Sequence, residues 1–480
     1  MAGIGFELKK IYRKEGIARA VAGGIYSSVV TIGPTVVVIV TLLFLYLALN
    51  MMKVSFMTRE LLSSTILYVF IFSIILTAPF NAVFSRYLAD KFYMDEYANI
   101  LPSFYTGILI LGILGTGISI PVMLSLYFRG GIDLPFILAA YVFWMSSVLL
   151  FFSVTYLHAT KDYKIIAIFF LVGMLVVVLT ALVFRFVLRA DRIHSILYGM
   201  AAGFLTIAVL EFSYIKRYFR TVSQNYTECL WYLVHHGKIW LTQLLYMLGL
   251  YVHNFIFWTT QQRLTVAQTY HSHQSYDMAS CLAMFTNIST MILFTVVAET
   301  RFHEAYQDYM ESIIGGTYKA IQKNKKIMFR TLSQQIGQVF GMQLAITSVI
   351  FLVLLIFGPY IGFSGMIMEI YPVLAVSYLG IFLLYGNLVY LYYFDDTKGT
   401  LLSALAYFAG TVLGTLVSKN LPVAFYGMGA FFGMLCGFTA SYFRIRYLEK
   451  NFEAHIFCHY KIIDTMKSSQ KGRIVYQKQA

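Results

Sequence analysis

A few polar side chains stand inside long apolar stretches of the sequence, where they could do chemistry that the surrounding residues cannot. His253 and Asn254 interrupt the aromatic run YVHNFIFW, Gln243 precedes them, and Asn287 and Gln343 lie within two later stretches. All five side chains can form hydrogen bonds. Inside a bilayer such groups cost free energy unless they find a partner or face water.

That cost leaves two interpretations of the five residues. Neutral hydrogen-bonding groups suit a hydrated transport path for a sugar, because sugar hydroxyls need both donors and acceptors. Alternatively, the side chains join neighbouring helices, which is worth about 0.6 to 2 kcal/mol for each hydrogen bond. Packing is the simpler interpretation for any single residue. The adjacent pair His253 and Asn254, on an otherwise apolar helix, favours the transport path.

Charged side chains are expected near the ends of the apolar stretches. The acids in or beside these stretches are Glu211, Glu299, Glu369, Asp395 and Asp396. Arg185 and Glu211 are close enough to an end for their charged groups to reach the interface. Because ion-driven transporters need a titratable group within the membrane, this pattern argues against ion coupling.

Twelve apolar stretches of about 20 residues must position these side chains, and each can cross a hydrocarbon core about 30 Å thick as a helix. The chain has 480 residues, of which 59% are hydrophobic and only 12% charged. The predicted spans are 26–49, 61–86, 103–127, 134–156, 164–187, 194–215, 239–260, 277–298, 338–358, 369–392, 400–418 and 421–443.

Lysine and arginine are distributed unevenly between the two sides of these stretches. With the N-terminus inside, 28 of the 36 basic residues lie on the inner side and 8 on the outer side. Because cytoplasmic loops accumulate these residues, we expect both termini in the cytoplasm. The same rule accounts for the net charge of +14 without a nucleic-acid partner.

The predicted fold class is therefore an all-α polytopic membrane protein with two six-helix halves. A cytoplasmic basic amphipathic segment, 1–25, precedes the first half, 26–215. A cytoplasmic connector, 216–238, leads to the second half, 239–443, and a cytoplasmic basic tail occupies 444–480.

The second half includes a longer polar segment, 299–337, which we expect to be an amphipathic cytoplasmic helix. Tyr306, Met310, Ile314, Tyr318 and Ile321 recur at helical spacing on one predicted face, and Gly315-Gly316 should break or bend the helix. Its basic residues favour contact with anionic lipid, with a cytosolic partner as the alternative. These lipid- or partner-facing candidates are Lys319, Lys323, Lys325, Lys326 and Arg330.

The sequence lacks the patterns expected of an enzyme. It contains no GxxxxGK[ST] phosphate loop, no HExxH motif and no credibly spaced Ser/His/Asp set. The four cysteines are scattered without metal-ligand spacing, so neither a metal nor another cofactor is expected. The longest aqueous segment is too short for a nucleotide-sugar-binding domain. These features favour a transporter.

Several longer motifs resemble the PelG family, the membrane transporters of Pel exopolysaccharide systems. The family is a branch of the superfamily that includes polysaccharide flippases and multidrug extruders. The motifs are MAGIGFEL at 1–8, TIGPT in the first predicted span, SRYLADKFY at 85–93, ETRFHEAYQDYMESIIGGT at 299–317 and YFDDTKGTLL at 393–402. The resemblance thus extends over most of the chain.

This resemblance implies export of a growing amino-sugar polymer from the bacterial cytoplasm. It also implies a cytosolic glycosyltransferase partner and other membrane subunits, one of which senses cyclic-di-GMP. An ion-coupled flippase of lipid-linked oligosaccharide, or a multidrug exporter of the same superfamily, is the alternative. A membrane-embedded polymerase and a scaffold that only anchors the glycosyltransferase are less consistent with the sequence.

Overall fold

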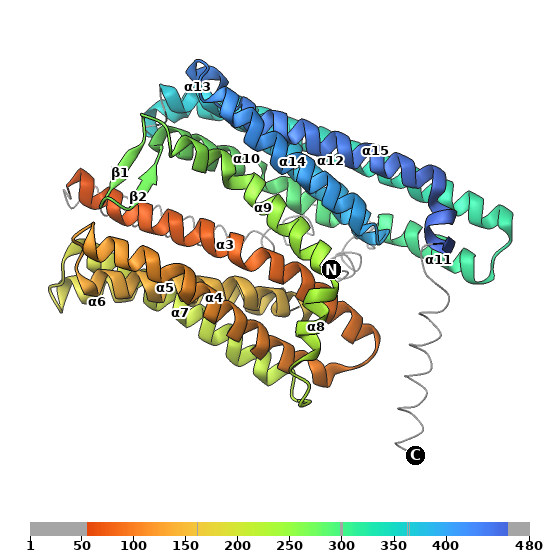
Figure 1. Cartoon of the computed structure of the whole chain (residues 1–480), viewed down its shortest axis with the longest axis horizontal. Helices are drawn as coiled ribbons and strands as arrows, with labels where there is room; N and C mark the ends of the chain where they lie inside the picture. Colours follow the sequence, from red (N-terminus) through yellow and green to blue (C-terminus); the bar gives the residue numbers. More distant parts are fainter. Residues whose placement is uncertain (1–54, 161, 298–300, 362, 364, 459–480) are drawn as a thin grey trace, which may run out of the picture.

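The computed structural model describes residues 55–160, 162–297, 301–361, 363 and 365–458 (Figure 1). This part of the chain is helical apart from one two-stranded hairpin. The longer helices are α3 (Phe56–Tyr93), α4 (Ile100–Phe128), α5 (Leu134–Thr160), α6 (Tyr163–Phe186), α7 (Arg192–Tyr218), α9 (Gly237–Phe257), α10 (Gln274–Val297), α12 (Tyr318–Ile361), α13 (Met366–Tyr393), α14 (Thr397–Ser418) and α15 (Met428–Cys458).

Shorter elements connect these helices. The turn before α4 is η1 (Tyr97–Asn99), the connector between α7 and α9 contains α8 (Glu228–His235), and α11 (His303–Gly315) precedes α12. The hairpin consists of β1 (Leu264–Val266) and β2 (Tyr270–Ser272), and η3 (Val423–Phe425) precedes α15.

Ten of the described helices are long and apolar enough to cross a membrane. The helix α10 lies where a further span is predicted but is not among these ten. The predicted first span, 26–49, falls outside the described residues, as does the amphipathic segment 1–25. The number twelve therefore remains a prediction, whereas the all-α, multi-span architecture is observed.

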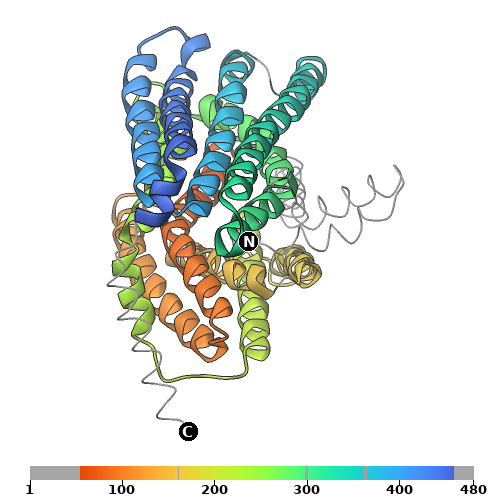
Figure 2. The same ribbon diagram turned by 90° about the vertical axis from the view of Figure 1, so that its right-hand side faces the viewer.

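The helices form two groups that lie side by side along the long axis of the molecule (Figures 1 and 2). One apolar core joins residues of α3 to α7, and two others join residues of α9 to α15. The helix α3 contributes to cores in both groups, through Val69 and Phe84 in one and Ile71 and Ile75 in the other. We call the contact between α3 and the second group the seam.

Small residues let α14 and α15 approach closely within the second group. A Cβ atom on Gly433 would lie 1.9 Å from the Thr411 hydroxyl, and one on Gly429 would lie 2.2 Å from the Thr415 hydroxyl. Such contacts bring helix backbones together where hydrocarbon supplies no hydrophobic driving force. Any larger side chain at these two glycines would separate the helices.

The segment 299–337 is helical on both sides of the predicted break. The chain turns at Gly315-Gly316 as predicted, but α12 then runs without a break from Tyr318 through the predicted span. The predicted apolar face is wrong for Ile314 and Tyr318, whose exposures are 88% and 74%. Both lie at the turn, where the helical period is interrupted.

Tyr306, Met310 and Ile321 of the predicted face do pack, against a buried core that includes Phe302, Tyr309, Met328, Phe329 and Leu332. This core also contains residues from the C-terminal ends of α13 and α15. The first 15 residues of the predicted basic tail, 444–458, belong to the helix α15. The rest of the tail, 459–480, lies outside the described residues.

Candidate transport site

Two adjacent polar residues of α9 lie in a buried hydrogen-bonded network in the second group of helices. The His253 ring is fully buried between two tyrosines, with Nδ1 2.8 Å from the Tyr276 hydroxyl and Nε2 3.4 Å from the Tyr378 hydroxyl. A neutral imidazole offers one donor and one acceptor, so the two tyrosines satisfy both ring nitrogens.

A carboxylate that the sequence analysis did not single out lies at the centre of the same network. Asp277, in the first turn of α10, accepts hydrogen bonds from Asn254 Nδ2 at 2.7 Å and from Trp258 Nε1 at 2.9 Å. The backbone N–H of His273 donates to the other oxygen at 2.9 Å. These donors and the positive end of the α10 dipole offset part of the cost of burying the carboxyl group. The network around His253 and Asn254, predicted to be neutral, therefore contains an acid.

A second buried network joins α10, α12 and α13. Asn287 donates to the backbone oxygens of Ala283 and Ala375, both at 2.9 Å, and its own oxygen accepts from Thr347 at 3.0 Å. Gln343 donates to the same Asn287 oxygen at 3.3 Å and accepts from Ser289 at 2.7 Å. Asn287 and Gln343, predicted separately from the sequence, are thus direct partners.

Gln243 belongs to neither network. It lies ten residues before His253 on α9, about 15 Å along the helix axis, and it is half-buried. The five transport-path candidates therefore occupy three separate places. The side chains that complete the two networks come from α9, α10, α12 and α13 and from the chain between α9 and α10, all in the second group.

Aromatic rings separate the first network from the first group of helices at the seam. The Tyr68 ring stacks on Trp258 at 4.9 Å, and Phe72 stacks on Phe255 at 5.5 Å. Tyr68 and Phe72 belong to α3, whereas Phe255 and Trp258 lie on or directly after α9. Trp258 also donates a hydrogen bond to Asp277. Its stacking contact with Tyr68 therefore links the seam to the network that contains His253 and Asn254.

Glu211 lies in the other group of helices, on α7, and its carboxyl group is buried rather than exposed at the helix end. The side chain is fully buried on α7, and neither carboxyl oxygen has a hydrogen-bond partner in the described part of the chain. An isolated carboxylate is costly in such a place. The first group of helices therefore contains a buried acid.

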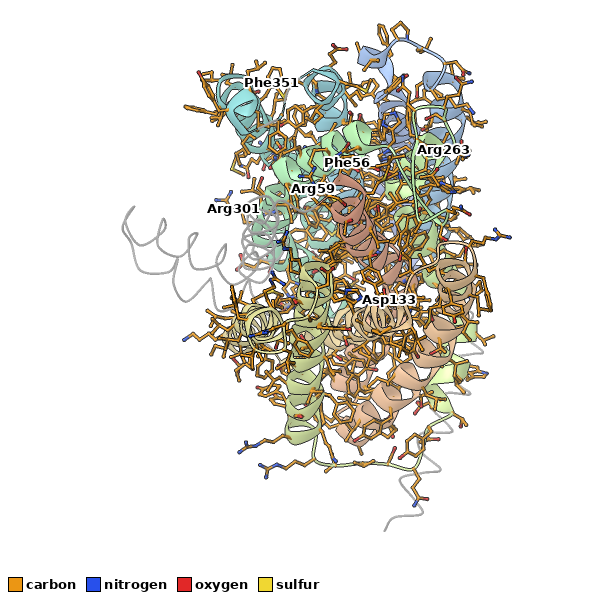
Figure 3. The ribbon with its side chains drawn as sticks, turned by 90° about the vertical axis from the view of Figure 1, so that its left-hand side faces the viewer. Phe56, Arg59, Asp133, Arg263, Arg301 and Phe351 are labelled. Atoms are coloured by element: carbon orange, nitrogen blue, oxygen red, sulfur yellow. The ribbon has the colours of Figure 1, made fainter. Side chains whose placement is uncertain are left out.

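Two pockets lie at opposite ends of the seam. The pocket at the hairpin end has a volume of about 340 Å³ and is lined by Phe56, Gln262, Arg263, Leu264, His273, Gln274, Ser275 and Met366. Figure 3 views the molecule from this end, with Phe56 and Arg263 labelled. Amide, imidazole, guanidinium and hydroxyl groups give this lining both donors and acceptors.

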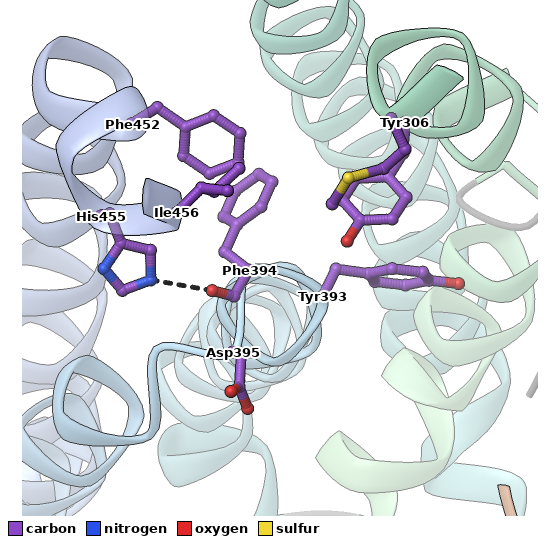
Figure 4. A pocket seen from close by; sticks show the side chains of 8 residues that line it. Tyr306, Tyr393, Phe394, Asp395, Phe452, His455 and Ile456 are labelled. Carbon is purple, nitrogen blue, oxygen red and sulfur yellow. Dashed lines mark hydrogen bonds between the residues drawn. The ribbon is translucent and has the colours of Figure 1, made fainter. Parts of the chain in front are cut away.

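The pocket at the other end is smaller and mostly apolar, with a volume of about 120 Å³ (Figure 4). Its lining residues are Tyr306, Met310, Tyr393, Phe394, Asp395, Phe452, His455 and Ile456. His455 Nε2 donates to the Phe394 carbonyl at 2.9 Å. Asp395 forms an ion pair with Arg86 of α3 at 2.8 Å, which ties the two groups together across the seam.

Four of the five basic candidates form an exposed stripe on the first turns of α12. We call these four exposed residues the basic stripe: Lys319, Lys323, Lys326 and Arg330. Lys325 differs, because it is half-buried and pairs with Glu453 of α15 at 3.1 Å.

Comparison with known proteins agrees with this architecture. A family described as "PelG: Putative exopolysaccharide Exporter (EPS-E)" matches residues 1–457. By sequence, the chain matches no curated protein.

Solved structures of multidrug transporters of the MATE family share the fold. An outward-facing MATE transporter of the MOP superfamily is 12% identical, with a TM-score of 0.60 over 88% of this chain and 96% of that chain. The eukaryotic MATE transporter AtDTX14 is 11% identical, with a TM-score of 0.61 over 93% and 95%. The Vibrio cholerae transporter VcmN, in its bent form, is 14% identical, with a TM-score of 0.57 over 94% and 99%.

Proposed function

Since the chain belongs to the PelG family of exopolysaccharide exporters, we propose that it moves a nascent amino-sugar polymer of the Pel type across the bacterial cytoplasmic membrane. The chain is a multi-pass transporter and not an enzyme. The observation that carries the proposal is the family match over 1–457, which includes both groups of helices. The polymer would pass along the seam between 26–215 and 239–443, with both termini in the cytoplasm.

The networks of the second group supply the polar groups that a glycan path needs. We propose that His253, Asn254, Gln243, Asn287 and Gln343 become accessible when the groups separate, with Asp277 holding Asn254 and Trp258 in place. In the closed seam, aromatic rings cover the first network. Aromatic rings and hydrogen-bonding groups together suit sugars, which present both apolar ring faces and hydroxyls.

Polymer secretion by a deletion strain complemented with variants tests this assignment. We expect His253→Leu to reduce secretion by about tenfold, equivalent to about 1.4 kcal/mol, at unchanged membrane abundance. His253→Gln should retain more secretion, because an amide can still meet the hydroxyls of Tyr276 and Tyr378. Adding Asn254→Leu should deepen the loss.

Asn387→Leu provides the matched control. Asn387 is equally buried in the second group and bonds Ser441 at 2.9 Å between α13 and α15, away from both networks. If Asn387→Leu and His253→Leu impair secretion equally, the role of His253 is packing. Normal secretion by the His253→Leu, Asn254→Leu double variant at normal abundance contradicts the path assignment.

The partners form a further part of the proposal. A cytosolic glycosyltransferase would deliver the polymer, and other membrane subunits, including a cyclic-di-GMP sensor, would complete the complex. The basic stripe supports a cytosolic contact, because it lies on the part of α12 that extends beyond the neighbouring helices (Figure 1).

An ion-coupled flippase of lipid-linked oligosaccharide, or a multidrug exporter, is the second candidate, and Glu211 is the observation that favours it. A buried carboxyl without a partner can exchange a proton when a conformational change admits water. With purified protein in liposomes containing a pH-sensitive dye, ethidium should then stimulate proton flux, and Glu211→Gln should abolish the stimulation. Glu369→Gln, which changes an exposed acid at the start of α13, is the control. Absence of stimulated flux in the wild type contradicts drug–proton exchange.

A further inference from the structure

The hairpin between α9 and α10 crosses the seam and docks on the first group of helices. Its strands pair antiparallel, with Val266 opposite Tyr270. These two side chains are 3% and 4% exposed, and they pack against Leu126 of α4 and Ile137 of α5. A part of the second group is thus seated in an apolar site built by the first.

Specific polar contacts fix the hairpin in this seat. The Tyr68 hydroxyl donates to the His271 carbonyl at 2.8 Å and accepts from the His271 N–H at 2.9 Å. The hydroxyls of Ser125 and Thr269 lie 2.9 Å apart. One tyrosine of α3 therefore binds the strand backbone in the way that a neighbouring strand would.

The hairpin tip is strained and touches a glycine of the first group. Ala267 and Gln268 both have φ of 50°, in the left-handed region that favours glycine or asparagine. A Cβ atom on Gly130 would lie 2.7 Å from the Ala267 oxygen and 2.7 Å from the Leu126 oxygen. Strained turns persist where surrounding contacts hold them, so undocking would relieve the tip.

The seat is also linked to the buried network. Tyr68, which binds the hairpin backbone, stacks on Trp258 at 4.9 Å, and Trp258 donates to Asp277 at 2.9 Å. A movement that separates Tyr68 from the second group therefore disturbs both the hairpin seat and the network.

We propose that this hairpin is a latch that closes the outer end of the seam and must leave its seat before polymer can exit. The inference rests on the proposed export function and on the predicted orientation, which places the hairpin outside the membrane. The contacts across the seam at this end describe the latched state.

A reversible crosslink tests the latch directly. Because the Ser125 and Thr269 hydroxyls are within 2.9 Å, cysteines at both positions have sulfur atoms close enough for a disulfide. In complemented deletion cells, oxidised Ser125→Cys, Thr269→Cys protein should lower secretion to the level of the deletion strain. A reductant should restore it. Each single-cysteine variant, treated identically, should secrete normally, and free thiols counted by a maleimide gel shift report the crosslinked fraction.

A second pair of variants tests the latch without a crosslink. Gly130→Ala should unseat the tip, so that Thr269→Cys reacts faster with a membrane-impermeant maleimide. Gly117→Ala on α4 is the matched control, because a Cβ atom there meets nothing within 4 Å. Normal secretion by fully crosslinked protein would overturn the latch, as would equal labelling rates in the two alanine variants. Failure of the wild type to restore secretion would instead overturn the export function.

Discussion

At the residue scale, two buried carboxyl groups differ in whether hydrogen-bond donors offset the cost of their burial. Asp277 accepts hydrogen bonds from an amide, an indole and a backbone N–H, which offset part of the cost of its burial. Glu211 has no such donor in the described part of the chain. Asp277 is therefore suited to holding Asn254 and Trp258 in fixed positions, whereas Glu211 is suited to carrying a proton.

His236, in the connector between α8 and α9, predicts how the stability of the fold depends on pH. The pKa of His236 is lowered from 6.5 to about 4, mainly by burial and then by the Arg86 cation and His235, against smaller opposing effects of Asp90 and Asp395. Between these pH values the unfolded chain binds more protons than the folded chain, so stability rises with pH in this window. The midpoint of thermal unfolding in detergent should fall as pH decreases from about 6.5 to about 4.

His236→Asn should show a smaller part of this acid destabilisation than the wild type. It should not abolish it, because burial also lowers the pKa of His271, His273 and His303. His235→Asn should also lessen the acid destabilisation, but by less than His236→Asn, because it removes one of the smaller contributions that lower the pKa of His236. Identical acid profiles for His236→Asn and the wild type would contradict the prediction.

At the scale of elements, helices were predictable where their apolar stretches fill a bilayer thickness. The predicted spans 103–127 and 134–156 lie within α4 and α5, because length and hydropathy alone specify such helices. The continuous α12 was not predictable in this way, since its first half is polar and depends on packing of Met328 and Phe329. The hairpin also escaped prediction. Its two strands are three residues each and its tip lacks glycine and asparagine.

The sequence predicts which residues belong to the site, but not which residues they contact. His253, Asn287 and Gln343 stand out as polar groups in apolar surroundings, and all three are fully buried and hydrogen-bonded. Their partners could not be foreseen, because Tyr378 lies 125 residues from His253 and Gln343 lies 56 residues from Asn287. Asp277 carried a weaker signal, as an acid in the first turn of a helix.

At the scale of the whole molecule, the seam is closed at both ends by different means. The docked hairpin covers one end, and the Arg86–Asp395 ion pair joins the groups at the other end, near the smaller pocket. Beyond that ion pair, α11 and the start of α12 extend further than the neighbouring helices (Figure 1). In the predicted orientation, this extension places the basic stripe where a cytosolic protein can reach it.

Distance favours a protein over lipid as the partner of the basic stripe. Lys326, Lys323 and Lys319 precede residue 338, the start of the predicted span, by about 18 to 28 Å along the helix. At physiological ionic strength the charge of anionic head groups is screened within about 8 Å. An acidic surface on a cytosolic glycosyltransferase could contact these residues directly.

Charge reversal on the stripe should therefore disrupt assembly. We expect Lys323→Glu combined with Lys326→Glu to abolish copurification of the glycosyltransferase with tagged protein and to lower polymer secretion, while membrane abundance stays normal. Raising the salt concentration should weaken copurification with the wild type in the same direction, because exposed charge pairs are screened. Lys419→Glu, which reverses a charge just after α14 at the opposite end of the molecule, is the control. Intact copurification accompanied by lost binding to anionic vesicles would contradict the protein contact and assign the stripe to lipid.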